Sequence, residues 1–312
     1  MSSHQTPSII YHYCSLDAFV SIINNHNIRL SNLYKTNDWS EKRYYGQMVI
    51  DYLSQRCSLN QEDISKLNIR LEELTNPTIG QTLSYACCFS EVSDSLSQWR
   101  MYGDNGFGVC IGFDVALLKK LRANTILSFD RVLYPKQFRR SDWDDRVLSS
   151  IDSIPKDKYN LTFVFDMLMA RSAFYKDPSY QMEKEWRIVV SSDKQYGGLI
   201  DVVDPIDQIR MKHWVYSWRE DCGFSLSGLK TTTMNRQLYS YLELGFSGVT
   251  KDLIKRIVLG PSSLVHPHEV YELLCENIPI ETDDLSRLMD KTRYDRIKRI
   301  ISVEKSIIPY RG

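Results

Sequence analysis

The sequence lacks an excess of charge of either sign. Its 312 residues contain 39 Lys and Arg against 39 Asp and Glu, so the formal net charge is zero. Proteins that bind nucleic acid or acidic membranes through overall charge have a positive excess, so composition supports neither class. Two short basic segments, FRR at 138–140 and RYDRIKR at 293–299, could contact a phosphate backbone. We interpret them first as solvated surface charge.

Long apolar runs are also absent. No stretch reaches the roughly 18 apolar residues that a membrane span needs. The first ten residues, MSSHQTPSII, contain no basic segment followed by an apolar one, which is the pattern of a secretory signal. We therefore expect no membrane partner and a cytoplasmic location. With 43% hydrophobic residues, the chain can bury a substantial core.

The cysteines show neither disulfide nor zinc-site spacing. There are seven, an odd number, and none forms a CxxC pair. We interpret them as reduced, buried thiols, including the adjacent pair Cys87 and Cys88. His266 and His268 flank a proline in a predicted turn and are expected to be surface residues, so no metal site is predicted.

Apolar patterning predicts an α+β fold. A strand over residues 8–13, a helix that Ser15 can cap and a strand over 28–33 follow one another within about 25 residues. Further strands are expected within residues 83–90, 107–114, 185–190 and 254–263, and helices within 64–74, 115–122, 161–175 and 267–277. Without repeats or an obvious linker, residues 1–265 are expected to form one domain with helical insertions. Residues 266–312 are expected to be a C-terminal helical extension packed on it.

The first candidate site segment is YHYCS at residues 11–15. It places His12 near the end of a strand, immediately before a helix. A lone histidine there is most often a half-buried strand residue. The functional alternative is that His12 hydrogen-bonds a ribose hydroxyl or a phosphate beside the helix N-terminus.

The second candidate is the loop between the strands at 83–90 and 107–114. It contains Ser90, Ser95, Trp99 and Tyr102, and a loop of this content can stack a flat ring and bind its polar edge. The simpler interpretation is a polar loop whose glycines form turns. Its glycine spacing matches neither a P-loop nor a dinucleotide-binding fingerprint.

The third candidate is SYQMEKEWRIVV, residues 179–190. Alternate residues of a strand point to the same face, so in a strand Glu183, Glu185 and Arg187 would share one side. A solvated strand face, with Arg187 paired to a glutamate, is the ordinary explanation. The alternative is that this side is the working face of a site.

In this order, the three segments resemble the signature motifs of the ADP-ribosyltransferase superfamily. HYCS at 12–15 resembles the histidine motif, the Ser/Trp/Tyr/Gly loop resembles the second region, and EKEWRIV resembles the third motif, a glutamate that leads an apolar strand. The resemblance implies a central mixed β-sheet, NAD as co-substrate and no metal. Over roughly residues 10–262 the chain also resembles a bacterial family long labelled as a domain of unknown function, whose relatives occur among defence and toxin-like genes. CFSE, EKEWR and IVLGP carry that second resemblance.

The transferase resemblance also implies catalytic roles. Glu185 would stabilise the oxocarbenium-like ribose as the nicotinamide bond breaks, and Glu183 would orient or deprotonate the acceptor. In the alternative register, Glu183 would be the catalytic residue, with Gln181 two positions before it. Arg187 would pair with a glutamate or contact a phosphate.

The remaining implied roles concern NAD binding. His12 would bind the adenosine ribose at the start of the first helix. Tyr102 or Trp99 would stack on nicotinamide, and one serine of the loop would support Glu185. The residues expected to bind the co-substrate are therefore His12, Tyr13, Ser15, Ser90, Ser95, Trp99, Tyr102 and Arg187.

The expected function is mono-ADP-ribosyl transfer from NAD to a macromolecule, by a toxin or an anti-phage defence effector. RNA is slightly preferred over protein as the acceptor, and a neutralising antitoxin is a candidate partner. Two alternatives stay open: an NAD glycohydrolase that uses the same pocket, and a non-catalytic interaction module on the same fold.

Overall fold

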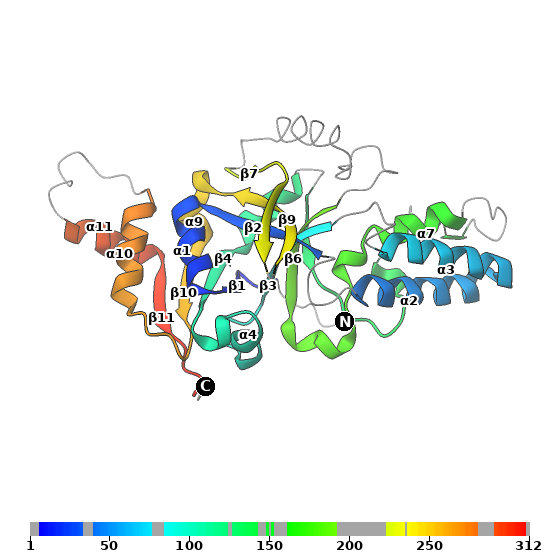
Figure 1. Cartoon of the computed structure of the whole chain (residues 1–312), viewed down its shortest axis with the longest axis horizontal. Coiled ribbons are helices and arrows are strands. Elements are labelled where there is room, and N and C mark those ends of the chain that lie inside the picture. Colours follow the sequence, from blue (N-terminus) through cyan, green and yellow to red (C-terminus); the bar gives the residue numbers. More distant parts are fainter. Residues whose placement is uncertain are drawn as a thin grey trace.

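The computed structural model describes residues 6–33, 40–76, 84–123, 127–142, 148–149, 151–152, 161–191, 223–234, 236–279 and 290–309. Over these residues the chain forms one large sheet with helices packed against it (Figure 1). The strands are β1 Ile9–Cys14, β2 Asn27–Asn32, β3 Ser84–Ser90, β4 Val109–Asp114, β5 Leu127–Arg131, β6 Glu185–Ser191, β7 Ser225–Leu226, β8 Lys230–Met234, β9 Gln237–Gly245, β10 Ile254–Leu259 and β11 Ser302–Lys305. The helices of the described chain are α1 Leu16–Asn25, α2 Ser40–Cys57, α3 Gln61–Thr75, α4 Leu96–Met101, α5 Val115–Leu118, α7 Leu161–Met169, α9 Thr250–Leu253, α10 Pro267–Asn277 and α11 Asp290–Ile300.

The sheet is mixed. Its main path runs β11-β10-β4-β1-β3-β2-β9-β7, while β6 pairs with β3 and β5, and β8 pairs with β9. The β10–β11 pair is parallel, and the other ladders between described strands are antiparallel. The predicted α+β class with a mixed sheet is confirmed.

The N-terminal strand–helix–strand unit follows its sequence pattern closely. Ser15 caps α1 by accepting a hydrogen bond from the Ala18 amide at 3.2 Å, as expected of a serine before a helix. The buried face of α1 consists of Phe19, Ile22 and Ile23. His26 takes a left-handed conformation, with φ of 48°, and ends the helix.

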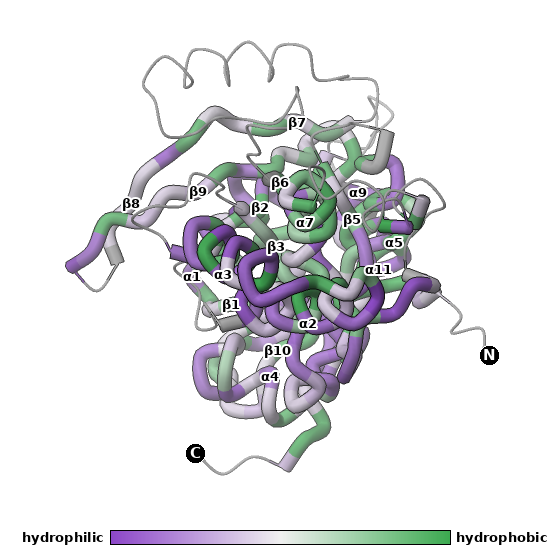
Figure 2. The backbone as a smooth tube through the Cα atoms, turned by 90° about the vertical axis from the view of Figure 1, so that its right-hand side faces the viewer, coloured by the Kyte–Doolittle hydropathy of each residue, from purple (hydrophilic) through white to green (hydrophobic). Residues whose placement is uncertain are grey.

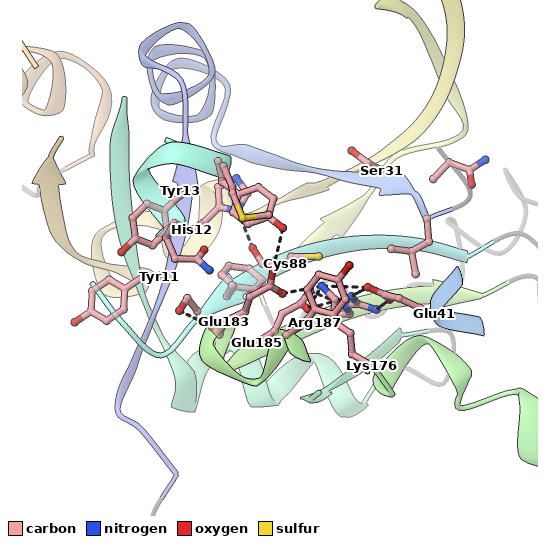
Figure 3. A pocket seen from close by; sticks show the side chains of 18 of the residues that line it. Tyr11, His12, Tyr13, Ser31, Glu41, Cys88, Lys176, Glu183, Glu185 and Arg187 are labelled. Atoms are coloured by element: carbon pink, nitrogen blue, oxygen red, sulfur yellow. Dashed lines mark hydrogen bonds and ion pairs between the residues drawn. The ribbon is translucent and has the colours of Figure 1, made fainter. Parts of the chain in front are cut away.

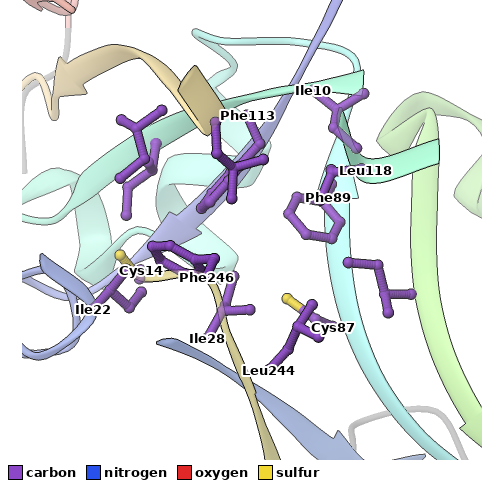
Figure 4. Packing of buried hydrophobic residues seen from close by; sticks show 14 of the residues in the cluster. Ile10, Cys14, Ile22, Ile28, Cys87, Phe89, Phe113, Leu118, Leu244 and Phe246 are labelled. Atoms are coloured by element: carbon purple, nitrogen blue, oxygen red, sulfur yellow. The ribbon is translucent and has the colours of Figure 1, made fainter. Parts of the chain in front are cut away.

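The two larger of the three hydrophobic clusters in the described residues lie on opposite faces of the sheet. The strands alternate between them: Trp186 and Ile188 of β6 enter the main core, whereas Val189 enters the second. In the main core, Phe113 packs edge-on against Phe89 and Phe246 at ring distances of 5.5 and 6.2 Å (Figure 4), an arrangement that aromatic quadrupoles favour. The main core is covered by α1, α10 and α11, and the second by α2, α3 and α7.

Helix α2 was not predicted from the sequence. It approaches α3 closely at Gly46, where an added Cβ would lie 2.2 Å from a methyl of Leu71, which would have to shift. Helix α3 contains the helix predicted within residues 64–74, with Leu67 and Leu71 buried. The tube in Figure 2 shows the hydrophilic stretches of these helices outside and the β8–β9 hairpin projecting from the main body.

The C-terminal segment belongs to the sheet as well as to the helical layer. Strand β11 was not expected, yet it pairs with β10 along its whole length. Ile297 of α11 and Ile301, which follows that helix, are fully buried in the main core. This segment was expected to be a helical extension packed on the domain, and its described residues supply a strand and core side chains as well as helices.

Strand β3 is fully paired along one edge and only partly paired along the other, and the sheet is split at the unpaired part. Along one edge it pairs with β6 over its full length. On the other edge, β2 pairs at Tyr85 and Ala86, and β1 pairs at Ser90. Residues 87–89 thus have no strand partner on that edge, and β1 and β2 diverge from each other around them.

Candidate active site

A cleft of about 390 Å³ opens at this split (Figure 3). Its size is typical of small-molecule pockets. Most of its walls come from the ends of β1, β2 and β3, the start of β6, and helix α4. The lining residues are Tyr11, His12, Tyr13, Ser31, Asn32, Leu33, Glu41, Cys88, Phe89, Ser90, Gln98, Met101, Tyr102, Lys176, Tyr180, Glu183, Glu185, Arg187 and Tyr239.

Seven of the residues predicted from the sequence line this cleft. They come from three segments that are far apart in the chain and meet because β1 and β6 flank the same strand, β3. The seven are His12, Tyr13, Ser90, Tyr102, Glu183, Glu185 and Arg187.

His12 lies in the split itself and is half-buried. Its Nδ1 lies 2.9 Å from the carbonyl oxygen of Cys88, which no strand partner covers. A carbonyl can only accept, so Nδ1 is the protonated nitrogen. Burial lowers the pKa of His12, against the opposing effect of this hydrogen bond. The imidazole is therefore neutral at pH 7, and its Nε2 is an acceptor.

Glu185 and Arg187 form a buried pair on one face of β6. They are 5% and 2% exposed, so the solvated strand face that the sequence suggested is wrong. Arg187 Nε donates to Glu185 Oε1 at 2.7 Å and Nη2 to Oε2 at 3.0 Å. This is a bidentate pair, the geometry in which a guanidinium binds both oxygens of a carboxylate.

Glu41, in the first turn of α2, binds the opposite side of Arg187. Its two oxygens accept from Nη1 and Nη2 at 2.7 and 3.0 Å, and the Ala173 carbonyl accepts from Nη1 at 2.7 Å. A guanidinium has five N–H groups, and all five are used here. Arg187 has no donor left for a phosphate, so of its two expected roles the structure supports pairing with a glutamate.

Lys176 completes the network, and it was not predicted. Its Nζ contacts Glu183, Glu185 and Glu41 at 2.7, 3.3 and 3.1 Å, which matches its three N–H groups. Burial works to lower the pKa of Lys176, but Glu185 and Glu41 raise it above its usual range. The amine is therefore protonated at any physiological pH.

The two cations determine the ionisation of Glu185. Burial alone would raise its pKa, but Arg187 and Lys176 lower it to about 2. Glu185 is thus a permanent carboxylate at neutral pH. Such a group can stabilise positive charge or accept a hydrogen bond, and it cannot act as a general acid.

Glu183 reaches the same cleft from a different element. It ends the 3₁₀ helix η7, Pro178–Glu183, and Lys184 follows in a left-handed conformation with φ of 45°. The expectation of three charges on one strand face is therefore wrong for Glu183. Its carboxylate nevertheless lies beside Glu185, because both bind Lys176. Gln181, the partner in the alternative register, is exposed and does not line the cleft.

Two other predicted residues, Tyr102 and Ser90, hydrogen-bond to Glu183. Tyr102 donates from its hydroxyl to Glu183 Oε1 at 3.2 Å. Ser90 is buried and donates to the backbone carbonyl of Glu183 at 2.7 Å. Ser90 therefore fixes the segment before β6, rather than hydrogen-bonding the Glu185 carboxylate as expected.

Three predicted residues lie outside the cleft lining. Trp99 is fully buried, and its indole donates to Asp94 at 2.6 Å, so it has no free face for stacking. Ser95 hydrogen-bonds Ser97 at 3.0 Å, and Ser15 caps α1. Tyr13 lines the cleft, but its hydroxyl donates to the Val92 carbonyl at 2.8 Å.

The prediction of a buried thiol is confirmed for Cys87 and is wrong for Cys88. Cys87 is buried in the main core, whereas Cys88 is exposed on the cleft side. Although part of Cys88 is open to the cleft, the surrounding protein desolvates its thiol. This desolvation and the neighbouring Glu185 raise the pKa of Cys88 well above its usual value, so it is a neutral thiol and a poor nucleophile. Cys222 lies outside the described residues.

No metal centre is visible in the described residues. No group of three or more His, Cys, Asp or Glu side chains there has an arrangement that could hold a metal ion. His266 caps α10 and binds the amide of His268, and His268 contacts Tyr294 at 2.9 Å. Among the helices so described, none is long and apolar enough to cross a membrane.

Comparison with known proteins gives one match. Residues 98–188 are similar to a family described as "Protein of unknown function (DUF2971)". The matched segment extends from α4 into β6 and includes Tyr102, Lys176, Glu183, Glu185 and Arg187. No curated protein and no solved structure matches the chain. The expected likeness to a family of unknown function is found over this central segment, and the likeness to ADP-ribosyltransferases rests on the motifs alone.

Proposed function

We propose that the protein is an ADP-ribosyltransferase-like enzyme that cleaves the nicotinamide–ribose bond of NAD and transfers ADP-ribose to a macromolecule. One observation carries the proposal. Glu185 is buried, permanently ionised and located in one cleft with His12 and Tyr102, as the order of the three motifs requires of such an enzyme.

The proposed chemistry uses the charge of Glu185. When the glycosidic C–N bond breaks, its electron pair goes to the ring nitrogen and nicotinamide leaves as a neutral molecule. The ribose carbon then carries positive charge, which a nearby carboxylate stabilises. Three N–H donors occupy Glu185, and a carboxylate has about four acceptor positions. The fourth acceptor position of Glu185 accepts a weak hydrogen bond from the Cys88 thiol. A ribose hydroxyl is a stronger donor and would replace the thiol there.

Glu183 is our candidate for the acceptor side of the reaction. It is held by Tyr102 and Lys176 and lies two residues before Glu185, the first residue of β6. There it would take the proton from the attacking hydroxyl or amine of the acceptor. His12 would accept a hydrogen bond from a ribose hydroxyl through Nε2.

RNA is the acceptor we propose in preference to protein. Tyr180 is 36% exposed and lines the cleft with the half-buried Tyr239, and unpaired bases stack on such rings. The basic segment at 138–140 adds no support, since Arg140 already donates to Asp152 and Tyr52. A role as a toxin or defence effector, restrained by a neutralising partner, is part of the same proposal and follows from the resemblance.

The proposal is tested with NAD labelled in its adenylate half, mixed with cellular RNA or cellular protein. The wild type should release nicotinamide and transfer label to RNA, and Glu185→Ala should do neither. Glu62→Gln, which removes an exposed carboxylate on α3, should behave as the wild type. Label found in protein and not in RNA would show that the acceptor is a protein. Free ADP-ribose alone would make the enzyme a glycohydrolase, and absence of nicotinamide release would reject the proposal.

A further inference from the structure

The part of the sheet formed by β2, β9 and β8 has one face that lies outside both large cores. From its other face, Leu30, Leu242 and Leu244 enter the main core. The second core reaches this part of the sheet at Leu33 and Ala86 and includes no described residue of β8 or β9. The core under α2, α3 and α7 therefore does not extend over this face, which continues onto the hairpin that projects from the main body (Figure 2).

Strand alternation places polar and aromatic side chains on this face. Ser31 of β2 lies opposite Tyr241 of β9, and Tyr241 lies opposite Lys230 of β8, so the three form one row across the strands. Arg29 and Tyr239 share the face, because each is two residues from a member of that row. Arg29, Ser31 and Lys230 are exposed, and the two tyrosines are half-buried.

Arg29 holds its guanidinium over a ring instead of pairing with a carboxylate. Its direct neighbour across the strands is Glu243, but Glu243 accepts from Lys230 at 2.6 Å and from Asn27 at 3.1 Å. The guanidinium carbon of Arg29 lies 4.6 Å from the centre of the Tyr241 ring, a cation–π distance. Among the described residues no carboxylate forms an ion pair with Arg29, so its N–H groups can bind an anionic ligand.

The charge of the face is positive. Arg29 and Lys230 contribute two positive charges and Glu243 one negative charge, and the exposed Arg236 adds a positive charge at the turn between β8 and β9. The chain as a whole is neutral, so this excess is local to the face. A positive surface that also presents flat groups is complementary to a ligand made of phosphates and unpaired bases.

We infer that the face of β2, β9 and β8 binds unpaired RNA. A base stacks on the guanidinium of Arg29, which Tyr241 supports from the side of the sheet, and the N–H groups of Arg29 contact a phosphate. Unpaired bases of RNA stack on guanidinium planes and on aromatic rings, including those of open sheet faces.

The face leads directly into the cleft. Ser31 and Tyr239 belong to both surfaces, and Ser31 lies at the edge of the cleft in Figure 3. A strand of RNA on the face would therefore bring a nucleotide towards Glu183. The choice of RNA rests on the proposed function, and the face adds to that function a surface that binds the acceptor.

RNA binding by the full chain, measured by fluorescence anisotropy without NAD, tests this surface. The probe is a labelled oligouridine of about twelve nucleotides, compared with the same strand annealed to its complement and with the corresponding DNA strand. Unpaired RNA should bind at least about fivefold more tightly than the duplex, because only unpaired bases are free to stack. Equal binding of strand and duplex would overturn the inference, and tighter binding of the DNA strand would overturn RNA as the partner.

Variants of the exposed Arg29 separate stacking from charge. Arg29→Lys keeps the charge but loses the flat guanidinium, so it should weaken the binding of unpaired RNA several-fold. Arg29→Gln loses both and should weaken binding further. It should also reduce the slope of log K against log salt concentration by about 0.7.

Arg56→Gln is the matched control. It removes an exposed arginine charge from the last turn of α2 and should change RNA binding by less than about twofold, since distant surface charges are screened. Wild-type binding by Arg29→Gln, or an equal loss in Arg56→Gln, would contradict the assignment of this face.

These results are distinct from those that test the cleavage of NAD. RNA binding that depends on Arg29, in a protein that releases no nicotinamide, would refute the proposed enzyme and support the RNA surface. Release of nicotinamide by a protein that binds no RNA through this face would support the enzyme and refute the surface.

Discussion

Replacement of Glu185 by glutamine should make the free energy of unfolding depend on pH differently from the wild type. Arg187 and Lys176 lower the pKa of the buried carboxyl from 4.5 to about 2. A depressed folded-state pKa stabilises the protein fully above the unfolded value and loses this effect as pH falls through the folded value. At 1.36 kcal/mol per pH unit, the ionised Glu185 contributes about 3 kcal/mol near pH 6.

The pH window follows from the same two pKa values. About 2 kcal/mol of that contribution should disappear between pH 6 and pH 3. Urea unfolding, followed by tryptophan fluorescence at several pH values, gives the free energy of unfolding of each protein. The gap, meaning the difference in this free energy between wild type and Glu185→Gln, measures the contribution of the ionised Glu185. The gap should be largest near neutral pH, where the variant leaves Arg187 and Lys176 short of a buried partner, and should narrow in acid.

Glu62→Gln is the control for this measurement. Glu62 has a side chain that is 74% exposed and pairs with Lys66, and such surface pairs contribute little. Its gap from the wild type should stay below about 0.5 kcal/mol at every pH. A gap for Glu185→Gln that stays constant from pH 6 to pH 3 would refute the reasoning, because Glu185 would then gain nothing from its buried partners when it ionises.

Three further predictions concern a glycine after β10, the acceptor of the Trp99 indole and the cysteine of the cleft. Gly260→Ala should lower the urea midpoint strongly, since its Cβ would lie 2.2 Å from the backbone oxygen of Gly106, and an unchanged midpoint would contradict that close approach. Asp94→Ala should lower the free energy of unfolding by about 1–3 kcal/mol, because it leaves the buried Trp99 indole without its acceptor. Asp94→Asn keeps an acceptor oxygen and should lower the free energy of unfolding less, and equal losses would contradict this. Cys88 should react with iodoacetamide more slowly than a free thiol at pH 8, owing to its raised pKa, and mass spectrometry showing the rate of a free thiol would exclude a neutral Cys88.

Local periodicity was enough to predict much of the fold. The β-branched and aromatic composition of β1, the alternation in β2, the serine cap of α1 and the apolar run after Glu185 all reflect short-range rules that the structure follows. The sequence also predicted that His12 and Glu185 lie on two strands, and in the structure these strands flank a common neighbour, β3. Helix α2 was missed because its polar and aromatic residues show little helical periodicity.

The charge network could be predicted only in part. Alternation suggested that Glu183 lies on the strand, but Pro178 starts a 3₁₀ helix there and Lys184 reverses the backbone. Glu41 lies 146 residues before Arg187, and Lys176 lies nine residues before Glu185, on the other side of the 3₁₀ helix η7. Both meet β6 only through tertiary packing. A strand with a carboxylate and a guanidinium beside buried residues did suggest that partners exist, but it could not identify them.

The most direct test of the account is the rate of nicotinamide release from NAD, measured by chromatography at pH 7 for wild type and Glu185→Gln. Both proteins should first be shown to be folded by circular dichroism under the same conditions. We predict steady release by the wild type and a loss of at least about a hundredfold in the variant, which lacks the buried carboxylate. Equal release by two folded proteins, or no release by either, would contradict the claim that this cleft cleaves NAD through Glu185.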